Sequence, residues 1–173
     1  MNKTFRLIIL GLFVAQSLVL YIVEGMIPVP FIAPGAKLGL ANLITVIALY
    51  ALPHKRDVCL ILLLRIVLAT AFAGGINAFL YSVAGAVFSL GIMMLLKQCS
   101  KFSIIGVSAA GGIFHNLGQL IIASLVVENA RLMLYLPVLS VAGAGTGILI
   151  GITTLFTLRH LQKLPLYERI QKI

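Results

Sequence analysis

The chain has 173 residues, of which 61% are hydrophobic and only 10% are charged, and its mean hydropathy is +1.16. This balance excludes an ordinary soluble domain and predicts a single membrane domain over residues 1–173. A net charge of +9 would suit a nucleic-acid-binding protein, but the basic residues lie in short gaps between apolar runs, as in membrane proteins. We therefore expect a lipid bilayer around this chain and no nucleic acid bound to it.

Six apolar runs predict an all-α bundle of about six transmembrane helices. Their approximate ranges are 7–23, 38–52, 58–73, 76–96, 104–127 and 132–158, and a basic cytoplasmic tail covers 159–173. No small-x-small cleavage site follows the first run, so we interpret it as a membrane helix and not as a signal peptide. Within this run, Gly11 and Ala15 form a small-x-x-x-small pair, which serves either packing inside the bundle or contact with a partner.

Residues 24–37 carry three prolines and two glycines, which predict a structured loop rather than a helix. The apolar run that follows, 38–52, is short for a membrane crossing, so we expect it to be re-entrant or tilted. Lys37 and Asn42 lie at its outer end, where a shortened helix beside a Pro-Gly turn can line a cavity.

Arg65 interrupts the third apolar run near its centre. An arginine at that depth costs about 2.5 to 3.5 kcal/mol even on the most lenient insertion scale, so we expect it to face the bundle interior and to hold a carboxylate, carbonyls or an anionic ligand. Glu24 is the nearest candidate by chemical type. Asn77, at the start of the fourth run, is expected at the outer mouth of the same interior.

The fifth run carries the polar residues around which the other helices are expected to pack. Spacing by three and four residues places Ser108, Gly111, His115 and Gln119 on one stripe of a helix, with Asn116 beside it. An unpaired polar group costs several kcal/mol in hydrocarbon, so this stripe should face a protein interior or a cavity.

The sixth run contains a doubled G-x-x-x-G pattern formed by Gly143, Gly147 and Gly151. Three glycines on one stripe of a helix predict a close helix contact, inside the bundle or with a partner.

The basic residues near the predicted helix ends set the orientation. One side has Lys3, Arg6, Lys55, Arg56, Lys97, Lys101, Arg159, Lys163, Arg169 and Lys172, and the other has Lys37 and Arg131. Because loops rich in Lys and Arg stay in the cytoplasm, both termini are expected there, which requires an even number of crossings. We expect a multi-pass protein of a bacterial cytoplasmic membrane.

Several motifs taken together resemble one family. They are Pro34-Gly-Ala-Lys-Leu-Gly-Leu-Ala-Asn42, Arg65, Ser82-Val-Ala-Gly85, Gly106-Val-Ser108, His115-Asn-Leu-Gly-Gln119 and Tyr135-Leu-Pro137. Over nearly the whole chain this combination resembles the Gx transporter family, also called heptaprenyl diphosphate synthase component I. In size and layout it is similar to the six-helix S components of energy-coupling factor (ECF) transporters, which capture vitamins and precursors from outside.

The enzyme name carried by the family can be tested against the residues. Prenyl diphosphate synthases hold Mg²⁺ with clusters of aspartates, whereas this chain has a single aspartate, Asp57, in a predicted cytoplasmic turn. The other acidic residues, Glu24, Glu128 and Glu168, are scattered. We therefore expect no prenyl synthase activity in the isolated protein, no catalytic residue, no metal site and no cofactor. The chain also lacks a G-x-x-x-x-G-K-[ST] motif for ATP.

Two functional classes remain for the polar interior. In the first, the protein is a substrate-binding membrane subunit that takes up a small polar or anionic solute from outside, such as a vitamin, flavin or quinone precursor. The expected solute-binding residues are Glu24, Lys37, Asn42, Arg65, Asn77, His115, Asn116 and Gln119. In the second, it is an integral scaffold in quinone- or flavin-linked electron transfer or polyprenyl-quinone metabolism, and the polar groups pair only with one another.

If the protein is a substrate-binding subunit, we expect two structural features. A cavity should open to the outer side and end near Arg65 and His115, which lie near the middle of their predicted crossings. Since no source of energy is visible in the chain, the resemblance to S components implies a membrane coupling subunit with ATPases, docked at Gly11 and Ala15 near the cytoplasmic end of the first helix.

Overall fold

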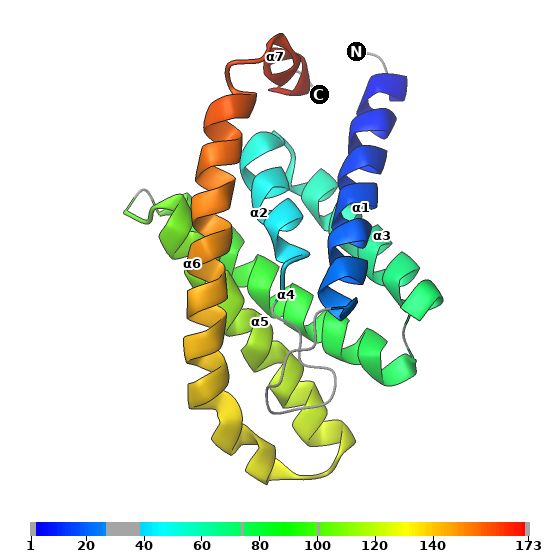
Figure 1. The fold of residues 1–173 in the computed structure, drawn as a ribbon, viewed down its shortest axis with the longest axis vertical. Coiled ribbons are helices and arrows are strands. Elements are labelled where there is room, and N and C mark those ends of the chain that lie inside the picture. The colour runs from blue at the N-terminus through cyan, green and yellow to red at the C-terminus, as the bar shows by residue number, and fades with distance from the viewer. Residues whose placement is uncertain (1–2, 27–38, 74, 100, 172–173) are drawn as a thin grey trace.

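The computed structural model describes residues 3–26, 39–73, 75–99 and 101–171, and all regular structure within them is helical (Figure 1). The helices are α1 (Lys3–Met26), α2 (Asn42–Ala51), α3 (Lys55–Ala73), α4 (Ile76–Gln98), α5 (Ile104–Val126), the 3-10 helix η1 (Ala130–Tyr135), α6 (Leu136–Leu161) and α7 (Pro165–Gln171). The all-α class predicted from the sequence is therefore confirmed.

Among the described residues, four helical segments are long and apolar enough to cross a membrane. They are Lys3–Met26, Phe79–Gln98, Ile104–Val126 and Ala130–Leu161. The predicted count of about six transmembrane helices is not confirmed. The helix α2 has only 10 residues, and α3 has three charged residues besides Lys55 within its 19 residues, namely Arg56, Asp57 and Arg65. The helix α2 is apolar but short, and α3 is long but carries charges, so neither counts among the long apolar helices.

The helix α5 packs against α4 on one face and α6 on another, because glycines on both faces let the backbones approach closely. A Cβ atom on Gly118 would lie 2.6 Å from the carbonyl oxygen of Ala84 on α4. A Cβ on Gly112 would lie 2.1 Å from the carbonyl oxygen of Gly143 on α6. The glycine stripe of α6 continues along the same contact, since a Cβ on Gly147 would lie 2.6 Å from the Ser108 carbonyl oxygen. Small residues thus fix the spacing of this three-helix layer.

The short helix α2 is held at its C-terminal end by two side chains from distant parts of the chain. Lys97 Nζ donates a hydrogen bond of 2.5 Å to the Leu49 carbonyl oxygen and lies 4.9 Å from the centre of the Tyr50 ring. Gln171 Nε2 donates a 2.8 Å hydrogen bond to the Ala51 carbonyl oxygen. A cationic donor and an amide donor suit this site, because the last carbonyls of a helix lack partners of their own and carry partial negative charge.

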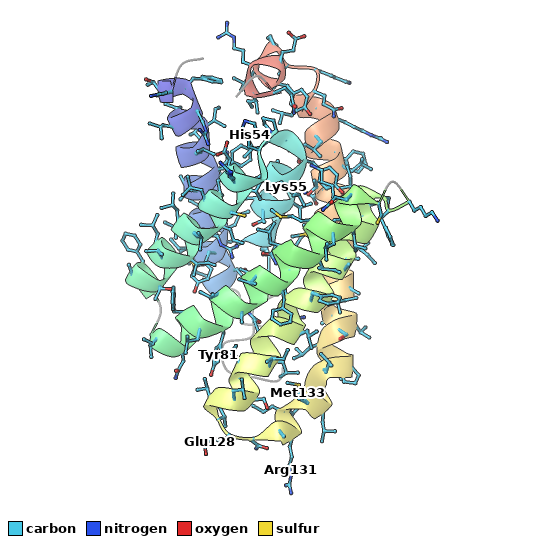
Figure 2. The ribbon with its side chains drawn as sticks, turned by 180° about the vertical axis from the view of Figure 1, so that it is seen from behind. His54, Lys55, Tyr81, Glu128, Arg131 and Met133 are labelled. Atoms are coloured by element: carbon cyan, nitrogen blue, oxygen red, sulfur yellow. The ribbon has the colours of Figure 1, made fainter. Side chains whose placement is uncertain are left out.

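The predicted tail over 159–173 is largely ordered helix. Residues 159–161 continue α6, and α7 then folds back so that Ile170 is buried in the core near α2. The beginning of α1 and the helix α7 lie at the same end of the molecule (Figure 1), and Glu128 and Arg131 lie at the opposite end (Figure 2).

Candidate functional site

Five of the predicted solute-binding residues meet around one small cavity, here called the charged cavity. Its lining residues are Tyr21, Glu24, Gly39, Ala41, Asn42, Arg65, Ser82, His115 and Gln119. They come from α1, the turn before α2, α2 itself, α3, α4 and α5. Residues far apart in the sequence therefore converge here.

A carboxylate and a guanidinium of opposite charge are buried at this cavity. The exposed fraction is 3% for Glu24 and 4% for Arg65, and the charge of Glu24 acts on Arg65. The Glu24 carboxylate also accepts a hydrogen bond from the backbone N–H of Gly39. Gly39 has φ +83, a conformation that other residues rarely adopt, so glycine is needed for this N–H to point at the carboxylate. The two charges offset each other's cost of burial.

The helix α5 contributes an imidazole and an amide to the same cavity. His115 Nε2 and Gln119 Nε2 are 3.2 Å apart, one helical turn from each other. In this amide orientation Gln119 donates, so His115 Nε2 accepts and a neutral imidazole carries its proton on Nδ1. The ring lies directly against Gly85 of α4, where a Cβ would come within 2.9 Å of His115 Nδ1. Gly85 thus leaves the space in which the imidazole sits.

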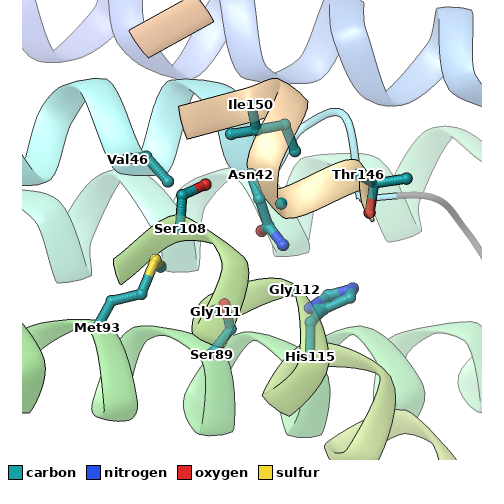
Figure 3. Close-up of a pocket in the computed structure, with 11 residues that line it drawn as sticks. Asn42, Val46, Ser89, Met93, Ser108, Gly111, Gly112, His115, Thr146 and Ile150 are labelled. Carbon is teal, nitrogen blue, oxygen red and sulfur yellow. The ribbon is translucent and has the colours of Figure 1, made fainter. Parts of the chain in front are cut away.

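A second cavity, here called the hydroxyl cavity, shares lining residues with the first. Figure 3 shows the residues that line it. It is lined by Asn42, Val46, Ser89, Met93, Ser108, Gly111, Gly112, His115, Thr146, Gly147 and Ile150. Asn42 and His115 line both cavities.

Both cavities are small. The charged cavity has a volume of about 20 Å³ and the hydroxyl cavity about 10 Å³. A cavity needs a volume of about 10 to 15 Å³ to hold one water molecule. The described residues therefore close around their polar centre, and a solute larger than water requires side chains such as Asn42 and His115 to move apart.

The other predicted site residues lie elsewhere. Asn116 Nδ2 donates a 2.7 Å hydrogen bond to the Leu139 carbonyl oxygen, so it ties α5 to α6 and lines neither cavity. Asn77 is exposed at the start of α4 and also lines neither cavity. Lys37 lies outside the described residues. Gly11 and Ala15 are exposed on α1, and a Cβ on Gly11 would have no other atom within 4 Å.

Tyr21 and Ser82 line the charged cavity although the sequence interpretation did not assign them to the site. Tyr21 carries a signal that could have found it, since it lies three residues before Glu24 and hence on the same helix face. Ser82 lies in a stripe of small residues, a pattern typical of helix packing. Its spacing therefore does not distinguish a packing residue from a binding-site residue. Among the described residues, no group of three or more His, Cys, Asp and Glu side chains could hold a metal ion.

Comparisons with known proteins identify one family. A family model described as heptaprenyl diphosphate synthase component I matches residues 13–157, which is most of the chain. No curated protein and no solved structure gives a match.

Proposed function

The chain belongs to the heptaprenyl diphosphate synthase component I family, and we propose that it is a membrane subunit that binds a small polar or anionic solute for uptake, in the manner of an S component of an ECF transporter. The observation that carries this proposal is the convergence of Glu24, Arg65 and His115 on one buried cavity. Ionisable residues inside a membrane are costly and most often serve a solute or ion pathway.

The chemistry of the cavity defines what it can bind. Arg65 can hold a carboxylate or phosphate oxygen, while Glu24 can accept hydrogen bonds from a cationic or N–H group. Asn42 and Gln119 add amides that both donate and accept. A small solute that combines an anionic group with hydrogen-bond donors fits this set best.

The direction of uptake follows from charge. The end of the molecule that holds the beginning of α1 and α7 also carries exposed basic residues, namely Lys3, Lys55, Arg56, Arg159, Lys163 and Arg169. By the distribution of Lys and Arg this end is cytoplasmic, so both termini are inside and the solute enters from the Arg131 side. The membrane is then the bacterial cytoplasmic membrane.

A partner is part of the proposal, because binding alone does not move a solute. The chain has no nucleotide-binding motif, so a membrane coupling subunit with ATPases would supply the energy. Gly11 and Ala15 form an exposed small patch on α1, which supports a contact with another helix there rather than packing inside the bundle.

We also propose that the protein has no prenyl synthase activity by itself. Its single aspartate, Asp57, is 1% exposed and forms an ion pair with Arg6, so this carboxylate is engaged on the protein. A cluster of carboxylates, which diphosphate-bound Mg²⁺ requires, is not encoded in the chain. Turnover of farnesyl diphosphate by the purified protein, free of soluble partners, would contradict this.

The small volume of the cavities favours one second candidate. If Glu24 and Arg65 serve only each other, the protein is an integral scaffold in quinone- or flavin-linked electron transfer or polyprenyl-quinone metabolism. Closure of the described residues around water-sized spaces is the observation in its favour.

Untargeted mass spectrometry of small molecules carried through purification separates the two candidates. A binding subunit should retain a polar solute that is lost in Arg65→Leu and kept in Arg131→Leu, which removes the same charge from an exposed position. Lipid as the only small molecule in the wild-type protein would support the scaffold and reject the binding subunit.

A further inference from the structure

The hydroxyl cavity contains polar atoms that the charged cavity does not explain. Ser89 Oγ and Ser108 Oγ are buried and have no hydrogen-bond partner among the described residues. Ser89 and Ser108 are each 2% exposed. A buried hydroxyl without a hydrogen-bond partner is costly, so two of them around one space require an explanation.

Several other hydroxyls in this bundle donate to backbone carbonyl oxygens. Thr70 Oγ1 donates to the Ile66 carbonyl oxygen at 2.8 Å, and Thr146 Oγ1 donates to the Ala142 carbonyl oxygen at 3.1 Å, each one turn earlier in its own helix. Ser17 Oγ donates to the Ala41 carbonyl oxygen at 3.3 Å. Ser89 and Ser108 make no such bond although helix carbonyls are within reach of any serine. Their hydroxyls remain available to a group in the cavity.

These groups reach one space from separate helices. Ser89 comes from α4, Ser108 and His115 come from α5, and Asn42 reaches the space from the start of α2 (Figure 3). Gly111 permits this arrangement, because a Cβ there would lie 3.3 Å from Ser89 Oγ and 2.6 Å from the sulfur of Met93. The two hydroxyls can each donate to an oxygen atom in this space, which His115 and Asn42 also line.

We propose that Ser89, Ser108 and His115 form a second subsite of the same binding site, which takes a neutral hydroxyl or carbonyl oxygen of the solute while the charged cavity takes its ionic group. This proposal rests on the proposed function. Movement of the Asn42 and His115 side chains would join the two spaces, and the subsite by itself has room for about one water molecule. The solute class is a small molecule with a charged group at one end and a neutral oxygen at the other.

The test compares small molecules that co-purify with the wild-type protein and with variants. The Ser89→Ala/Ser108→Ala double variant removes both hydroxyls, and each single variant removes one. Thr154→Val is the matched control, since Thr154 is 0% exposed and its hydroxyl has no partner, yet it lines neither cavity. Untargeted mass spectrometry measures the polar solute per mole of protein, and thermal unfolding in detergent checks folding.

We expect the double variant to fold and to retain at least about tenfold less solute, whereas Thr154→Val retains the wild-type amount. If the double variant does not fold, the single variants are scored in the same way, each with a smaller expected loss. Equal retention in the serine variants, together with loss in Arg65→Leu, would show that the subsite holds water only and would overturn this inference while the proposed function stands. A wild-type protein that retains lipid alone would overturn both.

Discussion

Gly112 of α5 and Gly143 of α6 face each other with their backbones in contact, so that a Cβ on Gly112 would lie 2.1 Å from the Gly143 carbonyl oxygen. The obstacle is backbone, which cannot rotate away as a side chain can. The separation of α5 and α6 is therefore set by the absence of two methyl groups, and the same separation positions His115 one turn further along α5.

Gly112→Ala should consequently destabilise the bundle strongly, by more than the 1 to 3 kcal/mol or so that overpacking usually costs, because α5 and α6 must move apart. The matched control is Gly145→Ala on α6, where a Cβ would have nothing within 4 Å. That control should leave stability unchanged or raise it by up to about 1 kcal/mol, since alanine favours helix over glycine. Thermal unfolding in detergent measures both, and equal midpoints would contradict the contact.

The central place of the fifth helix could be predicted from sequence, because its small and polar stripe repeats with the helical period. The role of each polar residue in or beside that stripe could not be predicted in this way. From the sequence, Asn116 is predicted to be a solute-binding residue beside His115. In the structure its side chain hydrogen bonds to the Leu139 carbonyl oxygen. Which backbone group an amide meets depends on how α6 is placed, and periodicity along α5 carries no information on that placement.

The second apolar run also shows what a local sequence pattern cannot predict. Its shortness was predicted, whereas its anchoring by Lys97 and Gln171, from residues 48 and 120 positions away, depends on contacts that no local pattern contains. The predicted count of about six transmembrane helices is not confirmed, for a related reason. An apolar run signals burial, and α2 buries most of its residues inside the protein rather than against lipid.

The opposite charges of Glu24 and Arg65 at one cavity give a prediction that separates charge balance from solute binding. Glu24→Gln leaves a buried guanidinium without its carboxylate, so stability should fall by about 3 to 5 kcal/mol. The double variant Glu24→Gln/Arg65→Leu removes both charges and should recover most of that loss, although it should not retain solute. Thermal unfolding and mass spectrometry of co-purified molecules give the two readouts. A double variant less stable than Glu24→Gln alone would contradict the pairing.

The contact between Arg6 and Asp57 predicts a separate effect at the end of the bundle where α3 begins. The guanidinium bonds both carboxylate oxygens, with Arg6 Nε 3.2 Å from Asp57 Oδ2, and so joins α1 to α3. Asp57→Asn should lower the unfolding temperature, because an amide cannot accept both bonds. Glu128→Gln, which changes an exposed carboxylate at the opposite end, should not change it. Equal unfolding temperatures for Asp57→Asn and the wild-type protein would show that this pair contributes little.

The last prediction concerns the exposed patch of Gly11 and Ala15 on α1. A Cβ on Gly11 would have no other atom within 4 Å, so larger side chains fit there without disturbing the bundle. Gly11→Leu with Ala15→Leu should therefore yield a protein that folds and retains its solute, since the charged cavity lies further along α1 at Tyr21 and Glu24. A coupling subunit that packs a helix closely on this patch would be blocked by two leucines.

The double leucine variant should accordingly lose co-purification with a membrane-embedded coupling subunit and its ATPases, and with it uptake. The control is Leu12→Ala with Val19→Ala, which changes other exposed positions of α1 from large to small side chains and should keep the partner. Aggregation of the leucine variant would assign the patch to internal packing, against the open space around Gly11. Normal uptake by that variant would show that the coupling subunit docks on another surface, because no close helix contact tolerates two added leucine side chains at its centre.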